Sequence, residues 1–272
     1  MVQTNSLAAE LLDIALNAAK SAGELLSKRP KNLDVTQKTS IVDFATQMDK
    51  ASENLIVNQI LGARPDDGIL AEEGSSVSGS SGITWIIDPL DGTVNYFYDL
   101  PAWNVSIAAA DENGALVGVV YSPSIGSLWT GIRGQGSFHN GEKIKTGNET
   151  NLQKSLVLTG FSYDLVKRVE QSAILEKMIP QVRDIRRFGS AAVDLCFVAM
   201  GKADAYYEYG LQPWDRAAGA LIAREAGAII SNWEGAEPDY EMVICANPAL
   251  HQILITKLQG IRGQVAGEKA PN

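Results

Sequence analysis

The spacing of apolar residues changes near residue 146, and this change restricts the folds open to the chain. Between Ile83 and Lys145, short runs rich in β-branched and aromatic residues are separated by turn sequences, which predicts an antiparallel sheet. Beyond residue 146, short apolar runs alternate with helical repeats, as in α/β proteins. The sequence therefore predicts two layered halves, an α+β half over 1–145 and an α/β half over 146–260, followed by a disordered tail at 261–272.

The expected elements follow from local periodicity. Apolar residues spaced by three or four predict a helix over 6–28, and a second helix is expected from about 42 to 61. A short strand at 69–71 and a Ser/Gly-rich loop at 74–82 come next. The antiparallel strands are expected at 83–87, 103–110, 115–121 and 127–131, with an Asn140-Gly141 hairpin. The second half is expected to contain strands at 155–159, 182–186, 203–207, near 229 and at 242–245, and helices at 165–178, 190–200, 215–226 and 248–258.

The net charge limits the partners that the chain can bind by charge alone. With 32 acidic and 23 basic residues the formal net charge is −9, which argues against broad binding to nucleic acid. An acidic protein that handles phosphate esters needs local positive charge, and divalent metal ions supply it. Cys196 and Cys245 lie in apolar stretches and are expected to be reduced core residues. The sequence lacks both a run of about 18 apolar residues and a leader-like start, so we expect a cytoplasmic protein without membrane contact.

The strongest chemical signal is an apolar strand that runs directly into two carboxylates. The segment Trp85–Thr93 reads WIIDPLDGT, with Asp88 and Asp91 on either side of Pro89-Leu90. We expect the strand to end at Ile87 and the carboxylates to lie in the loop beyond it, where α/β proteins usually carry functional groups. Two carboxylates that converge on one point repel each other unless a cation lies between them. Oxygen ligands of this type favour Mg²⁺, Mn²⁺ or Ca²⁺ over zinc.

Each acidic segment also has a purely structural interpretation. Asp88 and Asp91 could form an Asx-turn and a tight turn. Asp215, in the sequence PWDRAAGA, could simply cap the helix that it starts. Glu72-Glu73 follows a short strand and could be a solvated pair, although alternate residues of an extended segment face opposite ways. A two-metal site needs carboxylates from distant segments, and these three segments would supply them.

Taken together, these segments closely resemble the paired signatures of the inositol monophosphatase family. Trp85–Phe97, WIIDPLDGTVNYF, is similar to the first signature and PWDRAAG to the second. The similarity extends over about residues 10–260 and includes Ala71–Gly74 (AEEG) and Gly189–Val193 (GSAAV). The resemblance implies an αβαβα layered sandwich, which agrees with the predicted order of elements. It also implies a magnesium-dependent phosphatase with two or three ions per site, a homodimer, and inhibition by lithium.

The resemblance implies a set of metal ligands. Glu72 matches the family's glutamate ligand and Asp88 its bridging aspartate. Asp91 and Asp215 would complete the second metal position, and Leu90 would contribute only its backbone carbonyl. A third, weaker magnesium near Glu72 is also implied, which gives Glu72 a catalytic role.

The resemblance implies a second set of residues for phosphate and water. Gly92 and Thr93 match the turn that receives phosphate through backbone amides. Asp49 and Thr93 match the pair that orients or activates the attacking water. Lys38 matches a basic residue at the rim of the site, and a solvated lysine is the alternative. Water attack is favoured over a phospho-enzyme because His139 and His251 fall in no recognised motif.

The substrate remains open at this level. Glu208 and Ala191 match positions that touch the inositol ring, and the Glu208 carboxylate could accept hydrogen bonds from vicinal hydroxyls, pair with an amine, or be a solvated loop charge. The resemblance favours myo-inositol monophosphate, with histidinol phosphate and fructose 1,6-bisphosphate as alternatives. A binding protein of the transcription machinery and a purely structural metal site are the alternatives from other classes.

Overall fold

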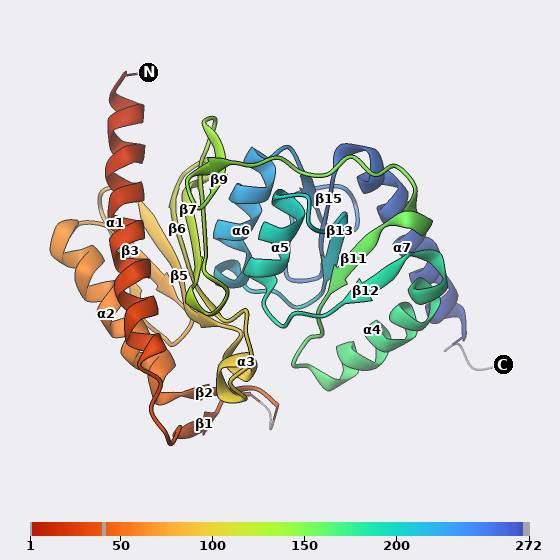
Figure 1. Cartoon of the computed structure of the whole chain (residues 1–272), viewed down its shortest axis with the longest axis horizontal. Helices are drawn as coiled ribbons and strands as arrows, with labels where there is room; N and C mark the ends of the chain where they lie inside the picture. The colour runs from red at the N-terminus through yellow and green to blue at the C-terminus, as the bar shows by residue number, and fades with distance from the viewer. Residues whose placement is uncertain (1, 40–41, 269–272) are drawn as a thin grey trace.

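Five layers of helices and sheets make up the chain in a computed structural model that describes residues 2–39 and 42–268 (Figure 1). The outer layer of the first half holds α1 (Val2–Ser27) and α2 (Gln47–Ala63), which pack on an eight-stranded sheet. The central layer holds α5 (Ala191–Ala199) and α6 (Pro213–Glu225), which lie between this sheet and a five-stranded sheet. The last layer holds α4 (Leu165–Met178) and α7 (Pro248–Glu268). The predicted αβαβα sandwich is therefore confirmed.

The eight-stranded sheet has the strand order β10-β9-β8-β7-β6-β5-β3-β4. Its neighbouring strands are antiparallel except β3 and β5, which run parallel because β4 and the loop at 78–83 return the chain between them. The bounds are β3 (Gly68–Ala71), β4 (Ser76–Val77), β5 (Thr84–Asp91), β6 (Asn104–Asp111), β7 (Gly114–Ser122), β8 (Ser127–Ile132), β9 (Gly136–His139) and β10 (Glu142–Lys143). Between β5 and β6 lies the five-residue helix α3 (Thr93–Phe97).

The five-stranded sheet has the order β12-β11-β13-β15-β14. Strands β12, β11 and β13 are parallel, and β15 is antiparallel to both of its neighbours. The bounds are β11 (Leu156–Thr159), β12 (Asp184–Arg186), β13 (Ala205–Glu208), β14 (Ile229–Ser231) and β15 (Val243–Ala246). The two sheets lie on either side of the predicted boundary near residue 146, but α5 and α6 pack against both of them. A division into two halves stays a prediction.

The start of α2 differs from the expectation of a helix from about residue 42. A short antiparallel pair, β1 (Val35–Gln37) and β2 (Phe44–Thr46), precedes the helix, which begins at Gln47. The Thr46 side chain accepts a hydrogen bond from the Met48 amide, and Asp49 at the third helical position accepts one from the Thr46 amide. This capping box fixes the helix start, because it satisfies amides that would otherwise lack partners.

The prediction of a disordered tail is wrong for residues 261–268, and residues 269–272 lie outside the described part of the chain. Helix α7 continues to Glu268. Ile261 and Val265 are buried against the five-stranded sheet, and the Arg262 guanidinium lies 4.7 Å from the ring centroid of Trp233. Composition suggested disorder because of the glycines, but the apolar residues still recur at helical spacing.

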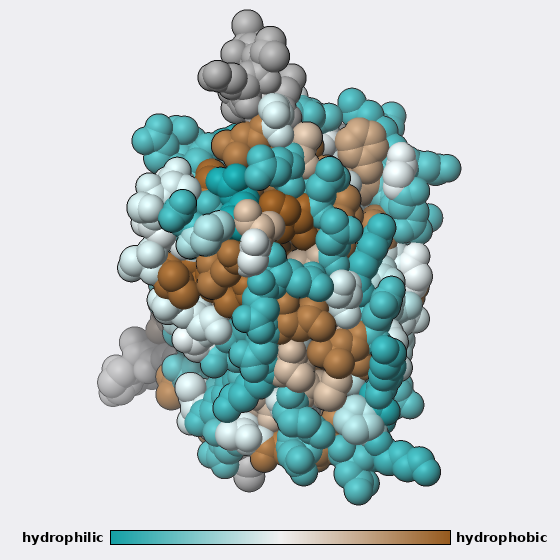
Figure 2. All heavy atoms as spheres, turned by 90° about the vertical axis from the view of Figure 1, so that its left-hand side faces the viewer, coloured by the Kyte–Doolittle hydropathy of each residue, from teal (hydrophilic) through white to brown (hydrophobic). Residues whose placement is uncertain are grey.

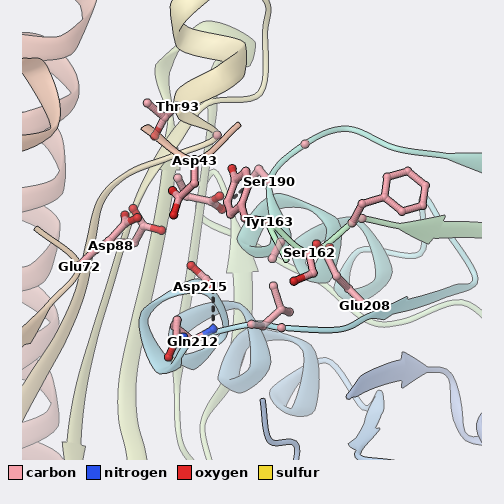
Figure 3. Close-up of a pocket in the computed structure, with 18 of the residues that line it drawn as sticks. Asp43, Glu72, Asp88, Thr93, Ser162, Tyr163, Ser190, Glu208, Gln212 and Asp215 are labelled. Atoms are coloured by element: carbon pink, nitrogen blue, oxygen red, sulfur yellow. Dashed lines mark hydrogen bonds between the residues drawn. The ribbon is translucent and has the colours of Figure 1, made fainter. Parts of the chain in front are cut away.

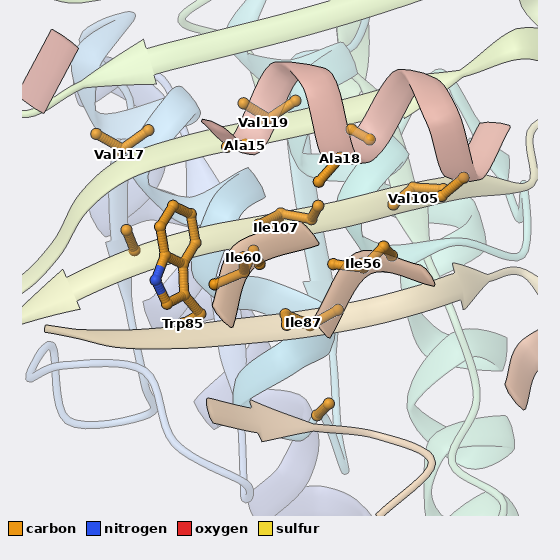
Figure 4. Close-up of a cluster of buried hydrophobic side chains, with 14 of the residues drawn as sticks. Ala15, Ala18, Ile56, Ile60, Trp85, Ile87, Val105, Ile107, Val117 and Val119 are labelled. Carbon is orange, nitrogen blue, oxygen red and sulfur yellow. The ribbon is translucent and has the colours of Figure 1, made fainter. Parts of the chain in front are cut away.

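A buried apolar core lies between the first two helices and the eight-stranded sheet and holds the strands of this sheet in place. Ala15 and Ala18 of α1 and Ile56 and Ile60 of α2 cover the sheet residues Trp85, Ile87, Val105, Ile107, Val117 and Val119 (Figure 4). Seen from the side of these two helices, hydrophilic side chains cover much of the surface and apolar groups show between them (Figure 2). No helix among residues 2–39 and 42–268 combines the length and the hydropathy needed to cross a bilayer.

Candidate active site

A cavity of about 760 Å³ brings together acidic residues from both halves of the chain. Glu72, Asp88 and Asp91 reach it from the eight-stranded sheet, and Glu208 and Asp215 reach it from β13 and α6. Figure 3 shows Glu72 and Asp88 together at one side of the cavity and Glu208 at the other. The volume lies within the range of small-molecule sites, roughly 300–1,000 Å³.

A β-bulge turns both carboxylates of β5 toward this cavity. Asp88 pairs with Ser106 and Asp91 with Asn104, so three steps along β5 match two steps along β6. In a regular strand, residues three apart face opposite sides, and the extra residue of a bulge cancels this alternation. The expectation that the strand ends at Ile87 was therefore wrong. β5 runs on to Asp91, and its pairing with β6 sets the direction of the Asp88 and Asp91 side chains.

Asp91 connects β5 of the eight-stranded sheet to the start of α5. Its Oδ2 accepts hydrogen bonds from Ser190 Oγ at 2.5 Å, the Ala192 amide at 3.1 Å and Asn104 Nδ2 at 3.2 Å. Burial raises the pKa of Asp91, and these three donors oppose the rise without cancelling it. Ser190 and Asn104 were given no role from sequence. An asparagine inside the apolar run of β6 was the available signal, because a buried amide needs a partner.

The remaining carboxylates repel one another. Burial raises the pKa of Asp88 well above its ordinary value, and the charges of Glu72, Asp91 and Asp215 raise it further. Burial, followed by the charges of Glu72 and Asp91, does the same to Asp215. Burial also raises the pKa of Glu72, although the charge of Lys38 opposes it. In protein without bound cations, this group therefore keeps its protons to higher pH than isolated carboxylates do.

The structural interpretations of two of these acids also hold. Asp88 Oδ1 accepts the Leu90 amide at 3.1 Å, which is an Asx-turn, and Asp215 Oδ2 accepts the Gln212 amide at 2.7 Å as part of a capping box. Both residues nevertheless line the cavity. The local hydrogen bonds hold each carboxylate in place at the cavity wall.

Lys38 and the acidic pair form a partly buried, ion-paired network rather than separate solvated charges. Lys38 Nζ lies 2.8 Å from Glu72 Oε1 and also contacts Glu73 Oε1. The side chain of Glu73 is only 3% exposed, whereas that of Glu72 is 23% exposed at the cavity. Burial lowers the pKa of Lys38, but the two glutamates outweigh it and raise the pKa overall. The turn after Glu73 is held by Glu53, whose carboxylate accepts the amides of Glu73 and Ser75.

Thr93 connects the cavity to a buried aspartate. Its Oγ1 lies 2.9 Å from Asp49 Oδ1 and 3.1 Å from the Leu90 carbonyl oxygen, and it can donate to either. Asp49 is fully buried, and its Oδ2 accepts the Thr46 amide and hydroxyl. Thr93 lines the cavity and Asp49 lies behind it, so Asp49 can act on a ligand only through Thr93. Gly92, with φ of +84°, allows the sharp turn into α3.

The far side of the cavity is lined by Glu208 and Ala191. Glu208 is 9% exposed, which excludes the solvated loop charge, and Ala191 lies nearby at the start of α5. Burial raises the pKa of Glu208 to about 7, against hydrogen bonding from Tyr206 and the charge of Arg187. Arg187 also lines the cavity, and sequence reasoning missed it. Two consecutive arginines just before the GSAAV segment were the available signal.

The donor set fits a hard cation by its chemistry and charge. Glu72, Asp88, Asp91 and Asp215 are among seven described acidic residues that line one cavity, and Lys38 and Arg187 are the cationic lining residues among those described. Carboxylate and carbonyl oxygens are the ligands that Mg²⁺ prefers. Within residues 2–39 and 42–268, no three His, Cys, Asp or Glu side chains stand ready in metal-binding geometry. Oδ2 of Asp91 and Oδ2 of Asp215 instead accept hydrogen bonds from donors of the protein.

Comparison with known proteins identifies the family. A model described as the inositol monophosphatase family matches residues 7–262. The chain belongs to the inositol monophosphatase family. It is 38% identical over 255 residues to a protein of Pasteurella multocida (strain Pm70) named Nus factor SuhB, covering 92% of this chain and 96% of that protein.

Solved structures of family members have the same fold. The extragenic suppressor protein suhB from Bartonella henselae superposes with a TM-score of 0.87 at 34% identity, covering 92% of this chain and 98% of that one. An inositol monophosphatase from Anabaena (Nostoc) sp. PCC 7120 gives a TM-score of 0.81 at 32% identity, covering 93% and 96%. The family resemblance and the fold expected from sequence are thus confirmed, and membership in an inositol monophosphatase family supports phosphatase chemistry at the cavity.

Proposed function

We propose that this protein is a magnesium-dependent phosphatase that hydrolyses a small phosphate monoester, with myo-inositol monophosphate as its substrate. The observation that carries the proposal is the meeting of Glu72, Asp88, Asp91 and Asp215, from both halves of the chain, at one cavity. Phosphate-monoester hydrolysis needs organised charge and geometry more than an unusual reactive group. The mutual repulsion of these carboxylates supports a cation-binding role, because such repulsion is costly unless it serves a ligand.

The proposed roles divide between metal, water and phosphate. The four carboxylates and the Leu90 carbonyl would hold two or three Mg²⁺ ions, which supply positive charge for phosphate oxygens and for an attacking water. Asp49 would accept the Thr93 hydroxyl hydrogen, so that the Thr93 oxygen can accept a hydrogen bond from that water and orient it. The Gly92 and Thr93 amides would bind the phosphate.

The remaining roles concern the ends of the cavity. Lys38 would favour the ionised form of Glu72. Glu208 and Ala191 would contact the ring of the leaving alcohol. The lining of this end by a buried carboxylate supports a polyol, because vicinal hydroxyls can donate two hydrogen bonds to one carboxylate.

Phosphate release from three substrates tests the proposal. Inositol 1-phosphate, histidinol phosphate and fructose 1,6-bisphosphate are compared by kcat/KM at saturating Mg²⁺ and in EDTA. We expect activity only with Mg²⁺ and the highest kcat/KM for inositol 1-phosphate. A higher kcat/KM for histidinol phosphate or fructose 1,6-bisphosphate would identify that compound as the substrate instead. If no phosphate ester released phosphate in a magnesium-dependent way, the proposed function would be contradicted.

A second candidate function comes from the names of the relatives. Because the Pasteurella protein is named a Nus factor, we infer that binding to the transcription machinery is a further candidate role. Purified RNA polymerase with its Nus factors is passed over the immobilised wild-type protein and the Asp88→Asn variant. Equal retention by both would support a binding role independent of hydrolysis, and no retention would exclude it.

Three further properties follow from the family resemblance and are proposed on that basis. We expect a homodimer in solution, inhibition by lithium, and a location in the cytoplasm. Light scattering of the purified protein tests the first, and the activity assay with added LiCl tests the second. Fractionation of cells that express the protein tests the third.

A further inference from the structure

The carboxylate of Glu208 lies in a space that only a glycine can provide. A Cβ atom added to Gly160 would fall 2.0 Å from Glu208 Oε2 and 2.2 Å from Oε1. Distances this short are far inside van der Waals contact, so any side chain at position 160 must displace the carboxylate. Gly160 directly follows β11, the strand that pairs with β13 and ends beside Glu208.

Tyr206 holds one oxygen of this carboxylate. The Tyr206 hydroxyl donates to Glu208 Oε2 at 2.8 Å, and both side chains are buried on the same face of β13. Residues two apart on a strand share a face, which makes this contact a consequence of the strand itself. Among the described residues no hydrogen bond reaches Oε1, so this oxygen is the one available to a ligand in the cavity.

The loop beneath the carboxylate is fixed by α4. Gln171, buried on α4, accepts the Ser162 amide at 2.8 Å through Oε1 and donates to the Gly160 carbonyl at 3.4 Å through Nε2. Strand β13, the Gly160 loop and α4 are therefore held in one arrangement. The position of Glu208 is thus set by contacts within the protein.

Burial moves the pKa of Glu208 toward neutral pH, and the neighbouring groups adjust it. Burial raises the pKa of Glu208 to about 7, while the Tyr206 hydrogen bond and the Arg187 charge lower it and the Asp91 charge raises it. Two further acids, Asp194 and Asp215, also interact with Glu208, and burial raises the pKa of each well above its ordinary value. Removing the Tyr206 hydroxyl therefore shifts the pKa of Glu208 upward and leaves less carboxylate at pH 7.

We propose that Tyr206 and Gly160 are positioning residues that hold Glu208 as a hydrogen-bond acceptor for hydroxyls of the leaving alcohol, and that they thereby set selectivity for polyol phosphates. Neither residue touches the reacting atoms, and both act through Glu208. The inference rests on the proposed phosphatase function, so its test compares a polyol substrate with one whose leaving group carries no further hydroxyl.

The test uses Tyr206→Phe with inositol 1-phosphate and 4-nitrophenyl phosphate. The measured quantity is the ratio of kcat/KM for the first substrate to that for the second, from pH 6 to pH 9 at saturating Mg²⁺. We expect this ratio to fall about tenfold at pH 7, the size of one lost hydrogen bond to a charged group. We also expect the pH midpoint of KM for inositol 1-phosphate to move upward, which a merely structural role would not produce.

Two other variants complete the design. Tyr207→Phe is the matched control, because Tyr207 is a buried tyrosine on the opposite face of β13, and the ratio should stay at the wild-type value. Gly160→Ala keeps the carboxylate but displaces it, and the ratio should fall as in Tyr206→Phe. An unchanged ratio in either Tyr206→Phe or Gly160→Ala, or an equal fall in Tyr207→Phe, overturns the inference. Wild-type protein that hydrolyses neither substrate would instead overturn the phosphatase function itself.

Discussion

Asp88 is a buried carboxylate that is repelled by the other carboxylates of the cavity. It is 2% exposed and lies near three other carboxylates, each of which raises its pKa. Without bound cations, the charge of Asp88 is therefore strongly repelled by its neighbours. Asp88 is also the proposed bridging ligand of the metal ions. A substitution that removes its charge should therefore act on activity and stability in opposite directions.

We expect Asp88→Asn to lower kcat/KM by about 10³-fold or more, comparable to the loss of a major charge-stabilising group. In EDTA the same variant should melt at a temperature no lower than that of the wild type, because a repulsive buried charge is removed. Phosphate release and thermal melting measure the two effects. Asp13→Asn, an exposed site on α1, is the control and should change neither. Near-native turnover of Asp88→Asn would rule out the metal assignment.

At Thr93, the role of a single atom, the hydroxyl oxygen Oγ1, can be tested by substitution. Thr93→Val keeps the shape but removes Oγ1, which leaves the buried Asp49 Oδ1 without its donor. We expect kcat to fall about 10²-fold or more, in the range of lost general acid–base assistance, with a smaller change in KM. Thr93→Ser retains the hydroxyl and should keep most of the activity. Similar kcat values for the Val and Ser variants would show that the hydroxyl has no part in the reaction.

At the scale of elements, α6 is held unusually close to the eight-stranded sheet. A Cβ atom at Gly118 of β7 would lie 2.9 Å from the Ala218 carbonyl oxygen and 3.1 Å from its Cα. Backbone cannot swing aside as a long side chain can, so α6 would have to shift. Because α6 carries Asp215 in its first turn, the packing of this helix and the geometry of the cavity are linked.

We expect Gly118→Ala to lower the free energy of unfolding by about 1–3 kcal/mol, as in other overpacked sites, and to lower activity as well. Gly62→Ala in α2 is the matched control. No atom lies within 4 Å of a Cβ at Gly62, so the substitution should stabilise the protein by up to about 1 kcal/mol through helix propensity. Urea unfolding and phosphate release measure both variants. Equal stabilities for the two would contradict the close packing of α6.

At the scale of the whole molecule, the acidic cavity links folding to pH and to metal. The pKa values of Glu72, Asp88, Asp91 and Asp215 are raised in the folded state, mainly by burial. Above about pH 4 these groups keep protons in the folded protein that the unfolded chain has released, so the stability that they contribute is lost as pH rises through their folded pKa values. Bound Mg²⁺ would remove this loss, because a ligand that binds only the folded state stabilises it.

We therefore expect the melting temperature in EDTA to fall between about pH 5 and pH 8, and added Mg²⁺ to raise it more at pH 8 than at pH 5. Burial lowers the pKa of His139 and His251, and these two residues act in the opposite sense. Comparison with Asp88→Asn isolates the carboxylates, since its melting temperature should depend less on pH. A magnesium effect of equal size at both pH values would contradict this coupling.

Periodicity predicted much of the fold because strands and helices of regular spacing carry their pattern locally. It failed where a distant segment decides the outcome. The bulge that continues β5 to Asp91 depends on pairing with β6, and the extension of α7 to Glu268 depends on packing of Ile261 and Val265. The early start predicted for the second helix failed for a different reason, since a capping box at Thr46 was not recognised.

The sequence by itself determined the family, the order of the main elements, and the acidic residues at which the chemistry is expected, since the motif around Asp88 is contiguous and specific. Long-range packing and strand pairing were needed to show that Asp88 and Asp91 face the same side, that Asp49 contacts Thr93 at the cavity, and that Glu208 is buried over Gly160. The physical reason is that a side chain's direction, burial and pKa depend on neighbours far away in the chain, and local sequence carries no record of them.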